Sequence, residues 1–222
     1  MNTRVVFAVL LFAGFFSCEK RSSSTKIDEV HVSNAADSLF YEAWAAYQFT
    51  DSASGSFLRY DCEVGRLKVS YGNQSFGRLV PSGYSQGQEC MMPTGRVPMY
   101  KAHSDKYLLL GFSCGLPCWS MMVCPMNETD SIYNVDYYYA YDLKSELIVS
   151  WDEDRLDNHP RLVIEHLGSR EKQFIPYAQC EDSMFSGYCI DLVEINEEEL
   201  SVTFNSDRGG DSTYLRKYQI LL

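Results

Sequence analysis

The chain from residue 56 onward is built of short apolar or alternating runs separated by Gly, Pro, Asn and Asp. Runs of this length, bounded by turn residues and rich in β-branched and aromatic residues, predict β-strands. Their close spacing predicts antiparallel connections. We predict strands at residues 56–60, 66–71, 77–81, 97–101, 106–112, 119–124, 132–142, 145–151, 161–167, 172–178, 188–194, 199–205 and 213–221.

This pattern predicts an all-β fold, an antiparallel sandwich or meander. An internal similarity adds an alternative architecture, because residues 139–143 are YAYDL and residues 188–192 are YCIDL. The aspartates of the two segments, Asp142 and Asp191, define a period of about 50 residues, which is typical of propeller-like blades. The domain is short for a closed ring, so the sandwich or meander is preferred.

A short helix is predicted before the strands. Ser33 and Asn34 are residues that favour a helix N-cap, and the apolar residues that follow recur at helical spacing over about 35–48. The apolar stripe consists of Leu39, Phe40, Trp44 and Tyr47.

The first residues have the organisation of an export signal. Arg4 precedes the apolar run Val5–Phe16, which is too short for a stable membrane-spanning helix and has the length of a signal-peptide core. The run ends at Ser17-Cys18, and this junction resembles the lipobox of bacterial outer-membrane lipoproteins of the Bacteroides type. In that family the chain is cut before the cysteine, which then carries the lipids, so the resemblance implies lipidation of Cys18.

The same resemblance divides the chain and places it in the cell. Residues 1–17 are the expected signal peptide, residues 18–33 the lipidated cysteine with a serine-rich flexible tether, and residues 34–222 a single β-rich globular domain. Residue 19 is Glu rather than the Asp associated with inner-membrane retention, which implies the outer membrane. Whether the protein faces the periplasm or the cell surface is left open, because no acidic run follows Cys18.

The net charge and the tyrosine content limit the classes of binding partner that are expected. The net charge of −11 argues against nucleic acids and against anionic membrane surfaces, so the lipid anchor is the only membrane contact expected. The 16 tyrosines favour strands and also offer stacking faces to a sugar ligand. The ligand is therefore left as a glycan or a protein, and no cofactor is predicted.

The cysteines are predicted to form disulfides, because an exported domain meets an oxidising environment. Gly115 and Pro117 favour a tight reversal that can bring the α-carbons of Cys114 and Cys118 within bridging range, about 5.5 Å. Cys124 lies too far along the following strand to join Cys118.

Two further bridges are predicted. Cys180 and Cys189 flank a polar loop of hairpin size, and Cys62 and Cys90 remain as the next pair by elimination. The number of cysteines is odd once Cys18 is set aside. Cys124 is therefore either free or takes the place of Cys62 or Cys90 in a bridge.

Metal binding and redox chemistry are the alternatives for the cluster around Cys114. Zinc sites favour tight C-x-x-C pairs, and a thioredoxin-like centre needs C-x-x-C at the start of a helix. The present spacing gives neither, so no metal is predicted. Residues 107–123, YLLLGFSCGLPCWSMMV, resemble a segment of uncharacterised periplasmic proteins with a G/S-C-G-x-x-C turn between two strands, which implies a stapled hairpin.

Two motifs suggest chemistry. Residues 83–87, GYSQG, match the nucleophile pentapeptide of serine hydrolases, with Ser85 as the nucleophile, but no strand–helix context surrounds them. Five Asp-Ser pairs resemble the D-[ST]-[AILVMT] O-glycosylation acceptor of exported Bacteroides-type proteins. They predict modification at Ser38, Ser52, Ser131, Ser183 and Ser212, with Ser52, Ser131 and Ser183 in surface loops.

The sequence therefore favours a non-enzymatic binding module anchored in the envelope. A structural or accessory envelope protein and a hydrolase using Ser85 are the alternatives. A glycan-binding module would show clustered exposed aromatic rings around Trp119 or Trp151, whereas a structural partner would show an exposed apolar patch.

Overall fold

The computed structural model describes residues 44–63, 66–81, 96–115, 118–153, 160–177, 189–205 and 213–222. The chain divides into residues 1–31 and 32–222, and every described residue belongs to the second unit. Within the described residues, no helix has both the length and the apolar character needed to span a bilayer.

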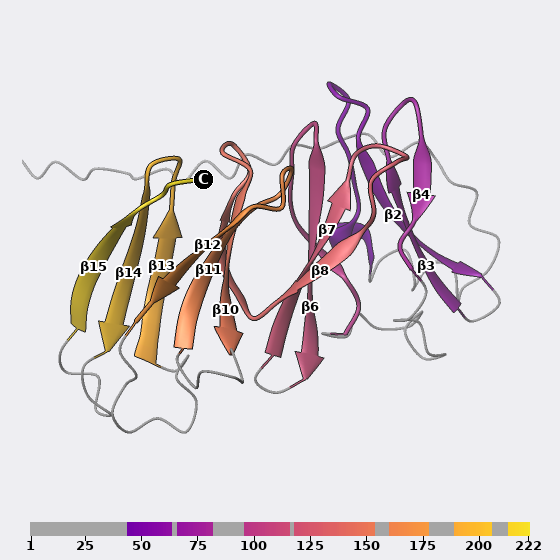
Figure 1. Cartoon of the computed structure of the whole chain (residues 1–222). Helices are drawn as coiled ribbons and strands as arrows, with labels where there is room; N and C mark the ends of the chain where they lie inside the picture. The colour runs from indigo at the N-terminus through magenta and orange to yellow at the C-terminus, as the bar shows by residue number, and fades with distance from the viewer. Residues whose placement is uncertain are drawn as a thin grey trace, which may run out of the picture. The chain divides into compact units, whose positions relative to one another are not determined.

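Fifteen strands form four antiparallel sheets among the described residues (Figure 1). The first sheet contains β1 (Phe49–Thr50), β2 (Phe57–Glu63), β3 (Arg66–Gly72) and β4 (Gly77–Leu79). The second contains β5 (Met99–His103), β6 (Tyr107–Gly115), β7 (Cys118–Pro125) and β8 (Tyr133–Asp136). The third contains β9 (Tyr138–Asp142), β10 (Leu147–Glu153), β11 (Pro160–His166) and β12 (Lys172–Pro176). The fourth contains β13 (Ile190–Ile195), β14 (Glu199–Asn205) and β15 (Thr213–Gln219).

Each sheet is a meander, because its strands lie side by side in the order in which they occur in the chain. The prediction of an all-β antiparallel fold is therefore confirmed. The described part of the predicted N-terminal helix is a 3-10 helix at Ala45–Tyr47, labelled η1, and the residues before 44 lie outside the described ranges.

Two strand predictions are corrected. The single strand predicted at 132–142 is two strands, β8 and β9, which belong to different sheets. Tyr137 separates them with a φ of 53°, a left-handed conformation that turns the chain from one sheet into the next. Asn134 and Asp136 precede this residue, but the prediction carried the strand through them because no Gly or Pro marks the break. The two-residue strand β1 was not predicted.

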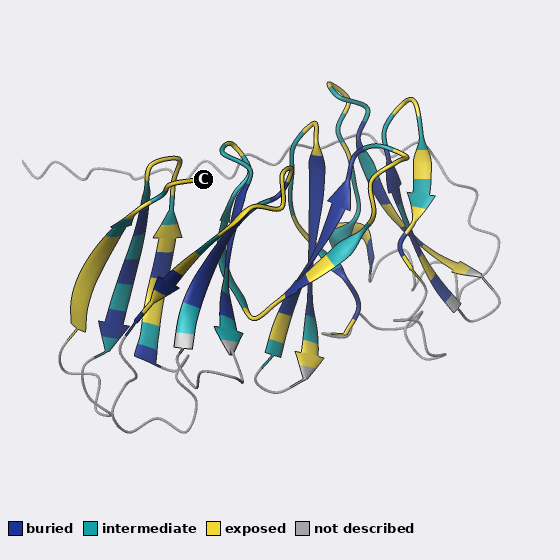
Figure 2. Cartoon of the chain, viewed as in Figure 1, coloured by how far each residue is buried: buried dark blue, intermediate teal, exposed yellow. Residues whose placement is uncertain are grey.

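Three hydrophobic clusters join consecutive sheets. Leu108 and Leu110 of β6 pack in a cluster with residues of the first sheet, whereas Tyr107 and Leu109 pack in a cluster with Ile148 of the third sheet. Successive residues of a strand point to opposite faces, so the second sheet is covered on both faces. Figure 2 shows β6 and β7 buried along much of their length.

The fourth sheet is covered on one face only. In β14, residues Leu200, Val202 and Phe204 are buried in a cluster with the third sheet, and the residues between them are only partly buried. The opposite face carries polar side chains from β14 and β15. Leu192 and Leu215 are also on that face, at 50% and 57% exposure, where both lie beside Thr203.

The first hairpin of every sheet begins with the same kind of turn. A short polar side chain accepts a hydrogen bond from the backbone N–H two residues further on, at 2.9, 3.3, 3.0 and 2.9 Å in chain order. Such side chains favour turns because they satisfy a backbone donor locally. The acceptors are Asp51, Ser104, Asp142 and Asn196.

Candidate functional site

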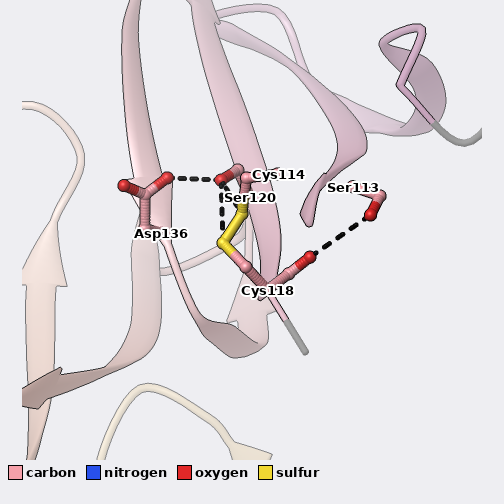
Figure 3. The surroundings of a disulfide bond; sticks show 5 residues. All are labelled: Ser113, Cys114, Cys118, Ser120 and Asp136. Carbon is pink, nitrogen blue, oxygen red and sulfur yellow. Dashed lines mark hydrogen bonds between the residues drawn. A yellow bond between two sulfur atoms is a disulfide. The ribbon is translucent and has the colours of Figure 1, made fainter. Parts of the chain in front are cut away.

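The candidate site lies at the end of the β6–β7 hairpin. The apolar residues of β6 hold the strand in the core, and the reversal follows at Gly115, which pairs with Cys118. Cys114 and Cys118 are bridged by a disulfide, with their α-carbons 5.1 Å apart, as the sequence predicted from the turn between them (Figure 3).

A serine and an aspartate complete the site. Ser120 is fully buried on β7, and its Oγ lies 3.0 Å from the Sγ of Cys114 and 4.0 Å from the Sγ of Cys118. The same hydroxyl makes a short hydrogen bond to the carboxylate of Asp136, which lies directly opposite on β8. A hydroxyl has a single proton, so Ser120 donates either to Asp136 or to the sulfur of Cys114 at any moment.

The two cysteines and the aspartate differ from the serine in their exposure to solvent. Cys114 and Asp136 are exposed and Cys118 is half-buried, whereas the serine between them is inaccessible to water. Next to the disulfide, Trp119 is 55% exposed. The other two tryptophans of the chain, Trp44 and Trp151, are buried.

The donor atoms of Cys114, Cys118 and Asp136 lie within 4.8 Å of one another, which is a spacing that a metal ion could bridge. Metal binding by cysteine requires thiolates. The two sulfurs are bonded to each other instead. In its oxidised form the site therefore offers one carboxylate and no thiolate ligand.

The remaining described cysteines fall into two groups. Cys62 and Cys189 are disulfide-bonded, and their predicted partners, Cys90 and Cys180, lie outside the described residues. Cys124 is free and buried on β7, and burial raises the pKa of its thiol to about 12, partly opposed by the charge of Arg78. A thiol of that pKa is unreactive at neutral pH in the folded protein.

Three kinds of predicted site lie outside the described residues. They are the hydrolase motif with Ser85, the predicted lipidation site Cys18, and the predicted glycosylation sites Ser38, Ser183 and Ser212. Ser52 and Ser131 are both exposed, the first after β1 and the second before β8. Their surface positions agree with the prediction, and glycosylation itself remains a prediction.

Two polar side chains of the third sheet have structural partners. Asp152 accepts two hydrogen bonds from Arg161, at 2.9 and 2.7 Å. Nδ1 of His166 accepts hydrogen bonds from the backbone N–H groups of Gly168 and Ser169, at 3.1 and 3.2 Å. The side chain of His166 therefore stabilises the β11–β12 turn.

Sequence reasoning identified the two cysteines of the site but not Ser120 or Asp136. Asp136 is 18 positions from Cys118 in the chain numbering, and its place beside the disulfide depends on the register of β7 with β8. No local signal encodes this register. If the end of β8 at Asp136 had been recognised, the placement of Asp136 near the β6–β7 turn could have been inferred.

Comparisons with known proteins add no assignment. No protein-family model matches the chain, and searches of the curated proteins and of the solved structures also give no match.

Proposed function

We propose that the chain is a lipid-anchored envelope protein whose β domain is a non-enzymatic binding module for a protein partner. The observation that supports binding is Trp119, a large apolar side chain that is 55% exposed beside a covalently closed hairpin. Tryptophan is among the residues that contribute most to the affinity of protein interfaces.

The rigidity of the surroundings strengthens this argument. Trp119 is adjacent to Cys118 and pairs with Ser113 of β6, and from the next residue, Ser120, β7 is also paired with β8. A side chain held on such a frame loses little backbone freedom when a partner covers it, so more of the contact energy remains as affinity.

A protein partner is favoured over a glycan. A glycan platform would combine several exposed rings, but Trp151 is only 9% exposed and packs edge-on against Tyr137, with ring centroids 5.3 Å apart. Among the described residues, no ring contact joins Trp119 to a second aromatic side chain. A single exposed tryptophan suits insertion into an apolar recess of a protein surface.

The anchor part of the proposal rests on the sequence. The apolar run Val5–Phe16 followed by Ser17-Cys18 supports lipidation of Cys18, and Glu19 supports an outer-membrane location. Replacing Cys18 with Ala is expected to release the protein into the soluble envelope fraction. A variant that stays membrane-bound and incorporates labelled palmitate would contradict this anchor.

In-cell photocrosslinking tests the binding part. A photoreactive phenylalanine at position 119 is expected to give a discrete cross-linked protein species. The matched control is the same residue at Phe174, which is 48% exposed on β12. Equal cross-linking at both positions, or none at 119, would reject Trp119 as the binding residue.

A further inference from the structure

We propose that the Cys114–Cys118 disulfide is a thiol–disulfide exchange site, which is reduced by an external dithiol and reoxidised by an external disulfide through the reverse reaction, while the domain stays folded. The proposal is independent of the function proposed above, since it concerns the reactivity of the bond and not the binding of a partner by Trp119. Four side chains take part: Cys114, Cys118, Ser120 and Asp136 (Figure 3).

The bond can be reached from solvent. Cys114 is exposed and Cys118 half-buried, whereas Cys189, which is bonded elsewhere, is only 5% exposed. Cys62 is also disulfide-bonded and exposed, so the disulfide of Cys189 is the shielded reference. Exchange requires the attacking thiolate to approach one sulfur along the line of the bond, so exposure decides which disulfides react.

Breaking the bond leaves the hairpin intact. β6 and β7 are paired from Tyr107 with Pro125 to Gly115 with Cys118, and the buried side chains of both strands fix this register. The cysteines are only four positions apart, so the bond closes a short loop and restricts the unfolded chain little. The site can therefore cycle between two oxidation states without unfolding.

Ser120 selects the leaving group. Its Oγ is 3.0 Å from the sulfur of Cys114 and 4.0 Å from that of Cys118, so its proton stabilises a thiolate on Cys114 better than one on Cys118. Because the serine is fully buried, this hydrogen bond does not compete with water. The preferred reaction is attack on Cys118 with departure of Cys114.

The exchange balances in two steps. A thiolate of the external dithiol attacks the Sγ of Cys118, a new S–S bond forms there, and the electron pair of the broken bond remains on Cys114. The second thiol of the dithiol, once deprotonated, then attacks the dithiol sulfur that is bonded to Cys118. An S–S bond forms within the dithiol, and Cys118 is released as a thiolate. The dithiol is oxidised to a disulfide, and its two protons pass through water to Cys114 and Cys118.

Asp136 opposes the reduction. Its carboxylate is within 4.8 Å of both sulfurs, so its charge repels a developing thiolate, and it also competes for the proton of Ser120. The two neighbours therefore act in opposite directions, which a purely structural bridge would not predict. Removing the hydroxyl should slow reduction, and removing the charge should accelerate it.

The test is the rate of reduction of the whole purified chain by dithiothreitol at pH 7. Samples are quenched with iodoacetamide and the alkylated peptides are measured by mass spectrometry. Cys124 does not interfere, because it is buried in the folded protein. The Cys114–Cys118 bond is expected to be reduced at least ten times faster than the disulfide of Cys189, which is 5% exposed.

Variants then separate exchange from simple exposure. Ser120→Ala is expected to slow reduction about tenfold, the loss of one hydrogen bond to a charged group, and Ser120→Thr, which keeps the hydroxyl, should restore the rate. Asp136→Asn should accelerate reduction about three- to tenfold. The control Asp105→Asn removes an exposed charge in the β5–β6 turn and should leave the rate within about twofold of the parent.

A second readout uses the parent alone, so it does not depend on how well the variants fold. The near-ultraviolet circular dichroism of the parent is recorded before and after selective reduction, and it should keep its folded signature. Unfolding on reduction, or equal rates for this bond and the disulfide of Cys189, would show that the bond is a staple. The proposal also fails if Ser120→Ala and Asp136→Asn shift the rate in the same direction or not at all.

Discussion

The second and fourth sheets are built from the same kind of meander but differ in how many faces are covered. In β6 and β7 of the second sheet, consecutive residues such as Leu108 and Leu109 are both fully buried. In β14 of the fourth sheet, buried and partly buried residues alternate strictly. The length of an uninterrupted apolar run therefore indicates whether a strand is covered on one face or on both.

The largest effect is expected when a charge is placed on each face of the two sheets. Leu108→Asp and Leu109→Asp should both abolish folding, because each puts an unpaired carboxylate into a core, at a cost above about 4 kcal/mol. On β14, Val202→Asp should do the same, whereas Thr203→Asp on the outer face should cost less than about 1 kcal/mol. Circular dichroism and size-exclusion chromatography of the four variants measure this. Tolerance of Leu109→Asp would contradict the two-sided burial of β6.

Truncation of leucines sharpens the comparison, because the residue type is constant. Leu109→Ala and Leu200→Ala, both at fully buried positions, should each lower the free energy of unfolding by about 2–5 kcal/mol. Leu192→Ala and Leu215→Ala, on the outer face of the fourth sheet, should each change it by less than about 0.5 kcal/mol. Urea denaturation gives all four values. A large loss at Leu215 would show that another surface covers this face.

A smaller effect is expected at Glu165, a carboxylate with 4% side-chain exposure on β11. It forms ion pairs with Arg170 and Lys172, at 2.7 and 3.1 Å, and both cations are nearly half exposed. Glu165→Gln should cost about 1 kcal/mol, since the cations it leaves unpaired are already hydrated. Replacing both cations with Met should cost more, about 2 kcal/mol, because a buried carboxylate remains without a partner. Thermal unfolding ranks the two variants, and the reverse order would contradict this account.

The smallest effect is expected on the outer face of the fourth sheet. A hydrogen bond from Lys217, at 2.8 Å, lowers the pKa of Glu199 from its ordinary value of 4.5. A lowered pKa in the folded state stabilises the protein above the unfolded-state value and loses this contribution as the pH falls through the folded-state value. The melting temperature of the parent should therefore slightly exceed that of Glu199→Gln at pH 7, and the two should converge in acid. A gap that persists at pH 2, or that does not shrink in high salt, would contradict the ion pair.

The strands could be predicted from the sequence because each is a short run between turn residues. β14 was predicted at 199–205, the range that the structure shows. The division of 132–142 into β8 and β9 was missed, because the turn is made by the left-handed backbone of Tyr137 and no Gly or Pro marks it. For the same reason the aspartate of the candidate site was missed, since Asp136 is the last residue before this break.

The disulfide at Cys114–Cys118 was predictable because its cause is local, a tight reversal between two close cysteines. The internal similarity between residues 139–143 and 188–192 was less informative. Asp142 begins the turn after β9, whereas Asp191 lies within β13, and the residue in the corresponding turn of the fourth sheet is Asn196. Hydrogen bonds therefore reveal the repeated turn better than the residue type does.

The consecutive strand order also has a consequence for how fast the domain forms. Each strand pairs with its neighbour in the chain, so hairpin closure requires only short loops and costs little chain entropy. Folds dominated by such local contacts cross lower barriers than β-folds with distant strand pairs. Once the first sheet exists, its apolar face provides a surface on which the next sheet can condense. The domain can thus form from β1 towards β15, without waiting for its last strand.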